Sequence, residues 1–157
     1  MWQKIKTYGI SIAIPLAVGG LSALITCNSM DIYDQINQPF LAPPSWLFPV
    51  VWTILFILMG VSVGLIYEAK NAKPEDKKKA FILYGVNLVL NFLWSIIFFN
   101  FGSFFIAFLL LMLLIFVILR MITAFNKISP TAAYLQVPYI IWCCFASYLT
   151  ASIWLMN

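Results

Sequence analysis

Histidine is absent from the 157 residues of this chain, and charged residues make up only 9% of it. Without histidine there is no Ser-His-Asp triad, no histidine-ligated haem or zinc and no histidine proton relay. The chain is also 64% hydrophobic, which is more apolar surface than a soluble domain of this length could bury. Lipid must therefore be the solvent for most of it.

Cysteine is scarce as well, with Cys27, Cys143 and Cys144 the only three. Adjacent helical side chains point about 100° apart, so Cys143 and Cys144 suit neither a shared metal nor a strain-free disulfide. We therefore expect no metal site and no cofactor. The net charge of +4 does not indicate a nucleic-acid partner, because the basic residues fall in short segments between long apolar runs.

Five apolar runs of membrane-spanning length predict an all-α, integral membrane bundle of five transmembrane helices in a single domain. The first run is long for a signal peptide, so we expect a retained helix. The expected spans are residues 5–26, 46–67, 80–100, 104–125 and 132–155, the last interrupted by Pro138.

The connector of residues 27–45, here called the lid, contains Asp31 and Asp34 but no lysine or arginine. Loops of this length are usually functional or disordered, and the prolines and aromatics here favour an ordered lid. All nine basic residues share one side of the membrane if the N-terminus is cytoplasmic. The sequence thus predicts a cytoplasmic N-terminus, with the lid and the C-terminus outside.

Small residues mark two helix faces. Gly9, Ala13 and Ala17 form a smooth ridge that suits either packing inside one chain or a dimer seam. Gly60 and Gly64 form a GxxxG pair, which favours close helix association.

Polar side chains inside spans are costly and need a reason. Asn87, Asn91 and Trp94 are spaced four and three apart, which places them on one helical face. The third span runs outward and the second inward, so Asn91, Trp94 and Trp52 all lie in the outer half, and Trp142 reaches similar depth on the fifth span. Aromatic or amide-rich faces from three spans therefore meet beneath the lid.

An interfacial belt of tryptophans, with asparagines that merely bond across helices, is the alternative. It suits Trp46, Trp154 and Asn87. It does not suit Trp52, Asn91 and Trp142, which lie deeper than a belt.

Three motifs resemble those of one known family: WxxLxxxMG from Trp52, LNxxWSxxFF from Leu90 and PYxxWxxFAxxL from Pro138. With the length and the five-span plan, they resemble the tryptophan-rich sensory protein, or translocator protein, family, also called the peripheral-type benzodiazepine receptor family. The resemblance implies a bacterial cell-membrane protein, commonly a homodimer, that binds porphyrins and isoquinoline carboxamide or benzodiazepine drugs. Some bacterial members are linked to light-dependent breakdown of protoporphyrin IX, which would be ligand or substrate here.

The resemblance also implies a set of site residues. Trp52 and Trp142 are the candidate photochemical pair, because a tryptophan in contact with an excited porphyrin can donate an electron. The chain offers no acid-base dyad or flavin motif, so the ligand must supply the photochemistry. The ligand-binding set carried over by motif is Tyr33, Trp52, Asn87, Asn91, Trp94, Trp142, Phe145 and Ala146.

Two stretches depart from the family pattern. Leu41 and Ala42 stand where the family has a tryptophan and the residue after it, ahead of the double proline, so contacts at the pocket mouth can differ. Thr150, Ala151 and Leu155 replace the asparagine, tyrosine and arginine of the cholesterol-recognition stretch. Sterol binding through that stretch is therefore not expected.

A transporter of porphyrins or other hydrophobic molecules is the alternative function. Transporters often show paired broken helices and buried ionisable residues. The prolines here form no matching halves, and no aspartate or glutamate lies mid-span. The sequence therefore favours a binding receptor, with moderate porphyrin affinity because no outer lysine or arginine pairs its carboxylates.

Overall fold

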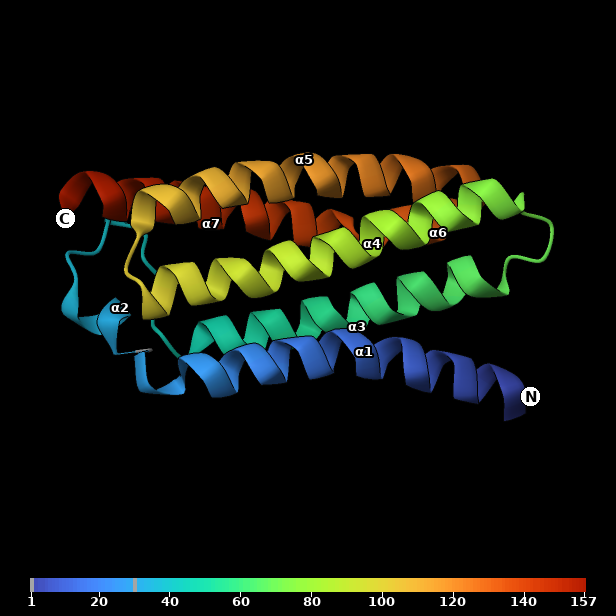
Figure 1. Ribbon diagram of the computed structural model, residues 1–157, viewed down its shortest axis with the longest axis horizontal. Coiled ribbons are helices and arrows are strands. Elements are labelled where there is room, and N and C mark those ends of the chain that lie inside the picture. The colour runs from blue at the N-terminus through green and yellow to red at the C-terminus, as the bar shows by residue number, and fades with distance from the viewer. Residues whose placement is uncertain (1, 30) are drawn as a thin grey trace.

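The protein is a bundle of long helices, shown in Figure 1 as a computed structural model that describes residues 2–29 and 31–157. Five helical segments in these ranges are long and apolar enough to cross a membrane, which makes the chain an integral membrane protein with five spans. The elements are α1 (Trp2–Thr26), η1 (Cys27–Ser29), α2 (Ile32–Gln35), α3 (Leu47–Glu68), α4 (Pro74–Ser95), η2 (Ile96–Asn100), α5 (Phe104–Ile128), α6 (Pro130–Tyr134) and α7 (Val137–Met156).

Helix α4 joins two helix pairs. Helix α1 packs against α3, α5 packs against α7, and α4 contacts both pairs. The N-terminus and the α3–α4 connector lie at one end of the bundle, whereas the lid, α2 and residue 157 lie at the other (Figure 1). The outward faces stay apolar, as with Phe116 at 60% exposed, because lipid rather than water covers them.

The GxxxG pair brings α3 against α1, as predicted. A Cβ atom on Gly60 would collide with the backbone of Ile12, and one on Gly64 would lie 2.6 Å from the Tyr8 ring. The ridge of Gly9, Ala13 and Ala17 is different, because all three residues are exposed. The ridge therefore does not pack inside the chain, and only the dimer-seam alternative stays open.

The third span begins earlier than expected, at Pro74 rather than Ala80. Proline is favoured in a first turn, and Glu75 and Asp76 in that turn face the positive end of the helix dipole. The solvated connector between α3 and α4 is thus only residues 69–73. The final five residues of this span, Ile96–Asn100, form a π-helical turn.

The fifth span is interrupted at Leu135 and Gln136, not at Pro138 as expected. Pro138 lies in the first turn of α7, where a missing N–H breaks no helical bond. The other spans shift less: the first begins at Trp2, the second covers Leu47–Glu68 and the fourth extends to Ile128.

The lid is ordered by hydrogen bonds, as predicted. The Tyr33 hydroxyl donates to the carbonyl of Pro43 at 3.0 Å, and the Gln38 amide donates to the carbonyl of Tyr33 at 2.6 Å. The side chain of Asn157 exchanges two bonds with the backbone of Asn37. These contacts hold the lid across the end of the bundle.

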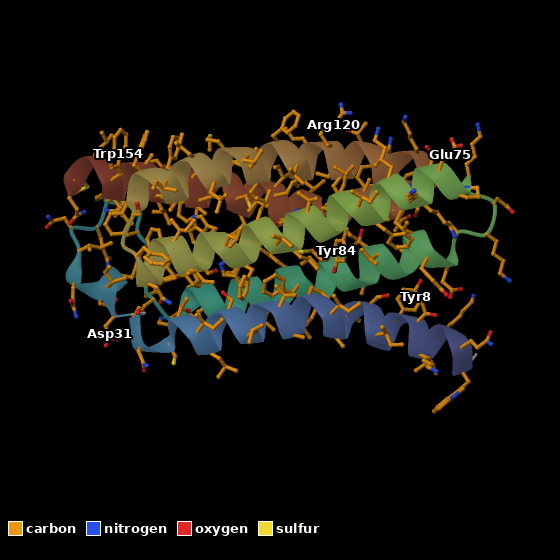
Figure 2. All side chains as sticks on the ribbon, viewed as in Figure 1. Tyr8, Asp31, Glu75, Tyr84, Arg120 and Trp154 are labelled. Carbon is orange, nitrogen blue, oxygen red and sulfur yellow. The ribbon has the colours of Figure 1, made fainter. Side chains whose placement is uncertain are left out.

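Charge divides along the bundle axis. In Figure 2, Asp31 lies at the lid end and Glu75 at the opposite end. Asp31 and Asp34 are the only charged side chains of the lid, whereas all nine basic residues lie in the half of the bundle that is away from the lid. Arg120 points outward from α5 (Figure 2).

Candidate ligand-binding site

A cavity of about 250 Å³ lies between α1, α3 and α4 in the half of the bundle next to the lid. We call it the inner chamber. Trp52 and Phe56 of α3 form one wall, Asn91 and Trp94 of α4 form another, and small residues of α1 such as Gly19 complete it. Mostly apolar walls with a few polar groups are typical of pockets for hydrophobic small molecules.

A second cavity of about 260 Å³, the outer chamber, lies under the lid. Asp31, Tyr33 and Asp34 of the lid line it. Phe48, Pro49 and Phe99 line both the inner and the outer chamber, and the rings of Phe48 and Phe99 stand between the two.

A third void of about 20 Å³ lies between the lid, α4 and α7, with Tyr33, Trp94 and Ala146 among its lining residues. Phe48 and Phe99 line this void too. A space of this size holds about one water molecule and no organic ligand.

Aromatic rings form a continuous cluster around the inner chamber. The Trp52 ring centroid lies 6.3 Å from that of Trp94 and 6.1 Å from that of Tyr139. Among the described residues, the Trp94 indole N–H is buried without a hydrogen-bond partner. The wall thus offers ring faces for stacking and one free donor.

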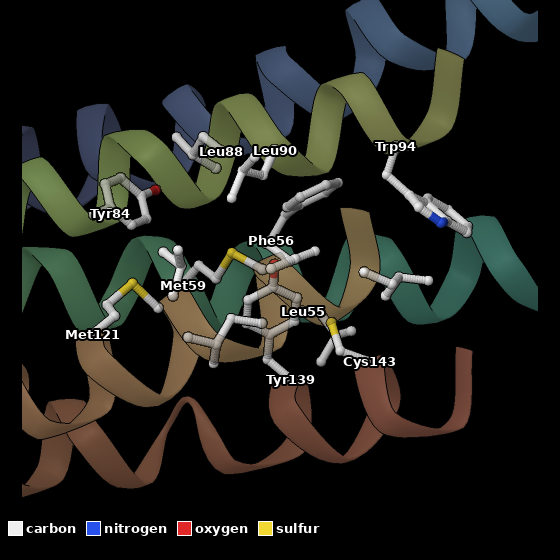
Figure 3. Packing of buried hydrophobic residues seen from close by; sticks show 14 of the residues in the cluster. Leu55, Phe56, Met59, Tyr84, Leu88, Leu90, Trp94, Met121, Tyr139 and Cys143 are labelled. Atoms are coloured by element: carbon white, nitrogen blue, oxygen red, sulfur yellow. The ribbon is translucent and has the colours of Figure 1, made fainter. Parts of the chain in front are cut away.

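A buried hydrogen-bond network backs the chamber. The Tyr139 hydroxyl donates to Asn87 Oδ1 at 2.6 Å and accepts a bond from Asn91 Nδ2 at 3.1 Å. Figure 3 shows Tyr139 reaching from α7 into the centre of the bundle, beside Met59 of α3. The two asparagines, one helical turn apart, thus hold α4 to α7 through one hydroxyl.

The lid end is electronegative. Asp31 and Asp34 are exposed, and both carboxylates line the outer chamber. Burial, together with the charge of Asp34, raises the pKa of Tyr33 to about 12. Tyr33 therefore stays neutral and keeps its bond to Pro43 at physiological pH.

The structure brings together only part of the predicted set. Trp52, Asn91 and Trp94 line the inner chamber. Tyr33 lines the outer chamber, and Ala146 lines the small void.

The remaining predicted residues lie behind these walls. Asn87 is fully buried in the Tyr139 network. Trp142 packs against Phe48 and Phe145, with ring centroids at 5.9 and 5.6 Å. Neither Trp142 nor Phe145 lines any of the three cavities described above.

Sequence reasoning missed Phe48, Phe99 and Tyr139. Tyr139 lies in the motif that begins at Pro138, four residues before Cys143 and three before Trp142, so a face count could have included it. Phe99 ends the motif that begins at Leu90, so the motif could have included it, whereas Phe48 gave no signal among the fourteen phenylalanines of the chain.

No group of three or more His, Cys, Asp or Glu side chains in residues 2–29 and 31–157 is placed to hold a metal ion. The chemistry of the two chambers is therefore that of aromatic rings, amides and two carboxylates.

A model of the TspO/MBR family matches residues 11–155, which include most of α1 and all of the other spans up to Leu155. The chain belongs to the TspO/MBR family. This confirms the resemblance drawn from the three motifs.

TspO proteins from distant organisms are similar over most of the chain. The tryptophan-rich protein TspO of Chlorobaculum tepidum is 36% identical, over 100% of this chain and 99% of that protein. That of Archaeoglobus fulgidus is 34% identical, over 94% of each. The translocator protein of Ovis aries is 30% identical, over 80% of this chain and 74% of its own length. The match to the TspO/MBR family thus reaches all five spans and includes the lid.

Proposed function

We propose that this TspO/MBR protein is a membrane receptor that binds protoporphyrin IX and flat, hydrophobic, drug-like molecules in the inner chamber. The observation that carries the proposal is the chamber itself, with Trp52 and Trp94 in its walls and the Asn91 amide beside them. Indole faces stack on flat aromatic ligands, and a few polar groups fix their orientation. Isoquinoline carboxamide and benzodiazepine-type drugs have this chemistry too.

Ligand size requires the two chambers to merge. Each chamber is below the ~300 Å³ at the lower end of pockets for drug-sized molecules. A tetrapyrrole disc would fill the inner chamber and extend into the outer one, which requires Phe48 or Phe99 to turn aside. The porphyrin carboxylates would then lie outward, near Asp31 and Asp34, and this repulsion keeps the affinity moderate.

Light-dependent breakdown of the bound porphyrin is part of the proposal. Trp52 lies in the chamber wall and is the contact donor of an electron to the excited ligand. Trp142 lies behind Phe48, with a ring-centroid distance of 5.9 Å, and is the second candidate. The ligand supplies the light absorption, and the chain holds it against the indoles.

The proposed setting is a bacterial cell membrane with the N-terminus in the cytoplasm. The confinement of basic residues to the end away from the lid supports this orientation. We further propose a homodimer, as the resemblance to the family implies.

An absorbance titration of the purified protein with protoporphyrin IX, in darkness and then under light, tests the receptor proposal. We expect saturable binding in darkness and loss of the porphyrin bands under light, slowed in Trp52→Phe and Trp142→Phe. Trp2→Phe is the control, because Trp2 is 80% exposed at the opposite end of the bundle. Binding that does not saturate would contradict the receptor proposal. Unchanged light-driven loss of the porphyrin bands in both variants would show that Trp52 and Trp142 are not the photochemical pair.

A liposome flux assay separates this receptor from a carrier of porphyrins. A receptor takes up ligand only to its own stoichiometry. Continued movement of porphyrin across the bilayer would favour transport instead.

A further inference from the structure

Four residues that line the inner chamber are exposed on the outside of the bundle. Gly20 and Ala23 belong to α1, and Pro49 and Thr53 belong to α3. The chamber residues of α4, by contrast, are buried or half-buried. The open side of the chamber therefore lies in the crevice between α1 and α3.

This opening faces the membrane rather than water. Gly20 lies six residues before the end of α1, and Thr53 lies six residues after the start of α3. At 1.5 Å per residue, each is about 9 Å along its helix from the lid end. The interfacial layer on each side of a bilayer is only about 5–8 Å thick, so both residues lie at the depth of the acyl chains.

The aqueous side of the chamber is obstructed. Phe48 and Phe99 separate it from the outer chamber, and the Tyr33 ring packs on Phe48 with centroids 5.0 Å apart. Tyr33 is in turn bonded to Pro43, and the lid is bonded to Asn157. Entry from water requires several of these groups to move, whereas Gly20 and Ala23 present almost no side chain to move.

We propose that hydrophobic ligands reach the inner chamber from the membrane, through an opening between α1 and α3 bounded by Gly20, Ala23, Pro49 and Thr53. We call this opening the lateral portal. The inference rests on the proposed binding function, and it adds the ligand class: molecules that dissolve in the acyl-chain layer before they bind. Binding then follows the concentration of ligand in the lipid, not in water.

The proposal is tested by placing a bulky side chain in the lateral portal. A Cβ atom on Gly20 would meet nothing within 4 Å, so the Cβ of Gly20→Phe fits there and its ring adds bulk at the rim. Gly85→Phe is the matched control, because Gly85 is equally open, is exposed on α4 and lines none of the three cavities. Protoporphyrin IX is mixed with protein in phosphatidylcholine vesicles, and tryptophan quenching follows the two rates.

We expect Gly20→Phe to slow association and release together by about tenfold, because a gate changes both rates and leaves the equilibrium nearly unchanged. Gly85→Phe should match the unmodified chain in both rates. If the affinity instead weakened because release alone became faster, the ring would occupy the binding site itself. The portal proposal would then be wrong.

A second variant tests the aqueous route. Asn37→Cys with Asn157→Cys, in a Cys27→Ser background, allows the lid to be crosslinked to α7. Crosslinking should leave both porphyrin rates unchanged. If crosslinking slows binding and Gly20→Phe does not, entry is from water and the proposal is wrong.

A measurement without porphyrin separates this inference from the receptor proposal. Phosphatidylcholine with brominated acyl chains quenches tryptophans that lipid can reach, and the Trp52 share is the difference from Trp52→Phe in each background. Gly20→Phe should reduce that share, and Gly85→Phe should not. Equal quenching in both would overturn the portal even if porphyrin binds, and a reduced share would support it even if porphyrin does not.

Discussion

The side chain of Asn157 pairs with the backbone of Asn37, 120 positions earlier in the chain: its Nδ2 donates to the Asn37 carbonyl at 3.1 Å, and its Oδ1 accepts from the Asn37 N–H at 3.0 Å. This pair ties the middle of the lid to the end of α7. The Asn37 side chain also donates to the Met156 carbonyl at 3.4 Å, so the lid is anchored to the last two residues of the chain.

Removing this tie should loosen the lid alone. Asn157→Ala deletes both bonds, and each exposed bond contributes about 0.5–1.5 kcal/mol, so amide exchange in residues 33–44 should quicken by about tenfold. Asn71→Ala, exposed at the other end of the bundle, is the control. Hydrogen exchange with mass spectrometry measures both. Equal protection in the two variants would mean that the lid is held by other contacts.

The Tyr139 hydroxyl should matter far more than that of Tyr84. Tyr139→Phe leaves Asn87 without a donor and Asn91 without an acceptor, which in a membrane costs about 1–2 kcal/mol. The buried Tyr84 hydroxyl has no partner among the described residues, so Tyr84→Phe should change the free energy of unfolding by less than about 0.5 kcal/mol.

Thermal unfolding in detergent compares these two tyrosine variants. A similar midpoint for both would show that the asparagines find other partners once the hydroxyl is gone. Porphyrin affinity should fall only in Tyr139→Phe, because Asn91 is then free to rotate in the chamber wall.

Charge at the lid should discriminate between ligands. Replacing both Asp31 and Asp34 by asparagine should tighten protoporphyrin IX binding by about two- to fivefold at low salt, because two like charges near its carboxylates are removed. A neutral isoquinoline carboxamide should bind as before. Added salt should narrow the difference, since it screens the repulsion.

The control for the lid charges is the pair Glu75→Gln and Asp76→Asn at the opposite end, which changes the net charge equally. Absorbance titration gives the affinities. If this control tightens porphyrin binding as much, net charge and not the position of the carboxylates is responsible.

Alkaline pH should open the lid through Tyr33. Its pKa is about 10 in an unfolded chain but about 12 in the folded lid, so between these values only the folded form keeps the proton. The stability that this contributes is complete below pH ~10 and is lost as pH rises towards ~12. Deprotonation also removes the bond to Pro43.

Amide exchange of the lid across this pH range, corrected for the intrinsic rate, measures the effect. Tyr33→Phe should lose the pH dependence but keep the ring contact with Phe48. A lid that loosens equally in Tyr33→Phe would assign the transition to another group.

The sequence predicted the fold well because membrane spans follow from length and hydropathy. It misplaced the start of α4, since Glu75 to Lys79 are polar residues that nevertheless lie in the first turns of the helix, after Pro74 at its first position. It also placed the break of the fifth span at Pro138, because a proline signals a break more strongly than Leu135 and Gln136 do.

The site was predictable only in part. Asn91, Trp52 and Trp94 stood out because polar or indole groups deep in a span need a reason. Whether Trp142 meets a cavity depends on how α7 packs, and Phe48 matters because it lies between two chambers. Neither property can be predicted from the spacing of residues in the sequence.

The contact between α1 and α3 is tight at Gly60 and Gly64 and again at Gly19, where a Cβ atom would collide with the Phe56 ring. Beyond Gly19 the last turns of α1 contact α4 and η2 instead, and Pro15 lies in the middle of α1, where a helix lacks one backbone bond and bends most easily. We expect α1 to tilt so that ligands of different size fit, while the packing of α4, α5 and α7 stays unchanged. The range of ligand sizes that the protein binds would then depend on how easily this one helix bends.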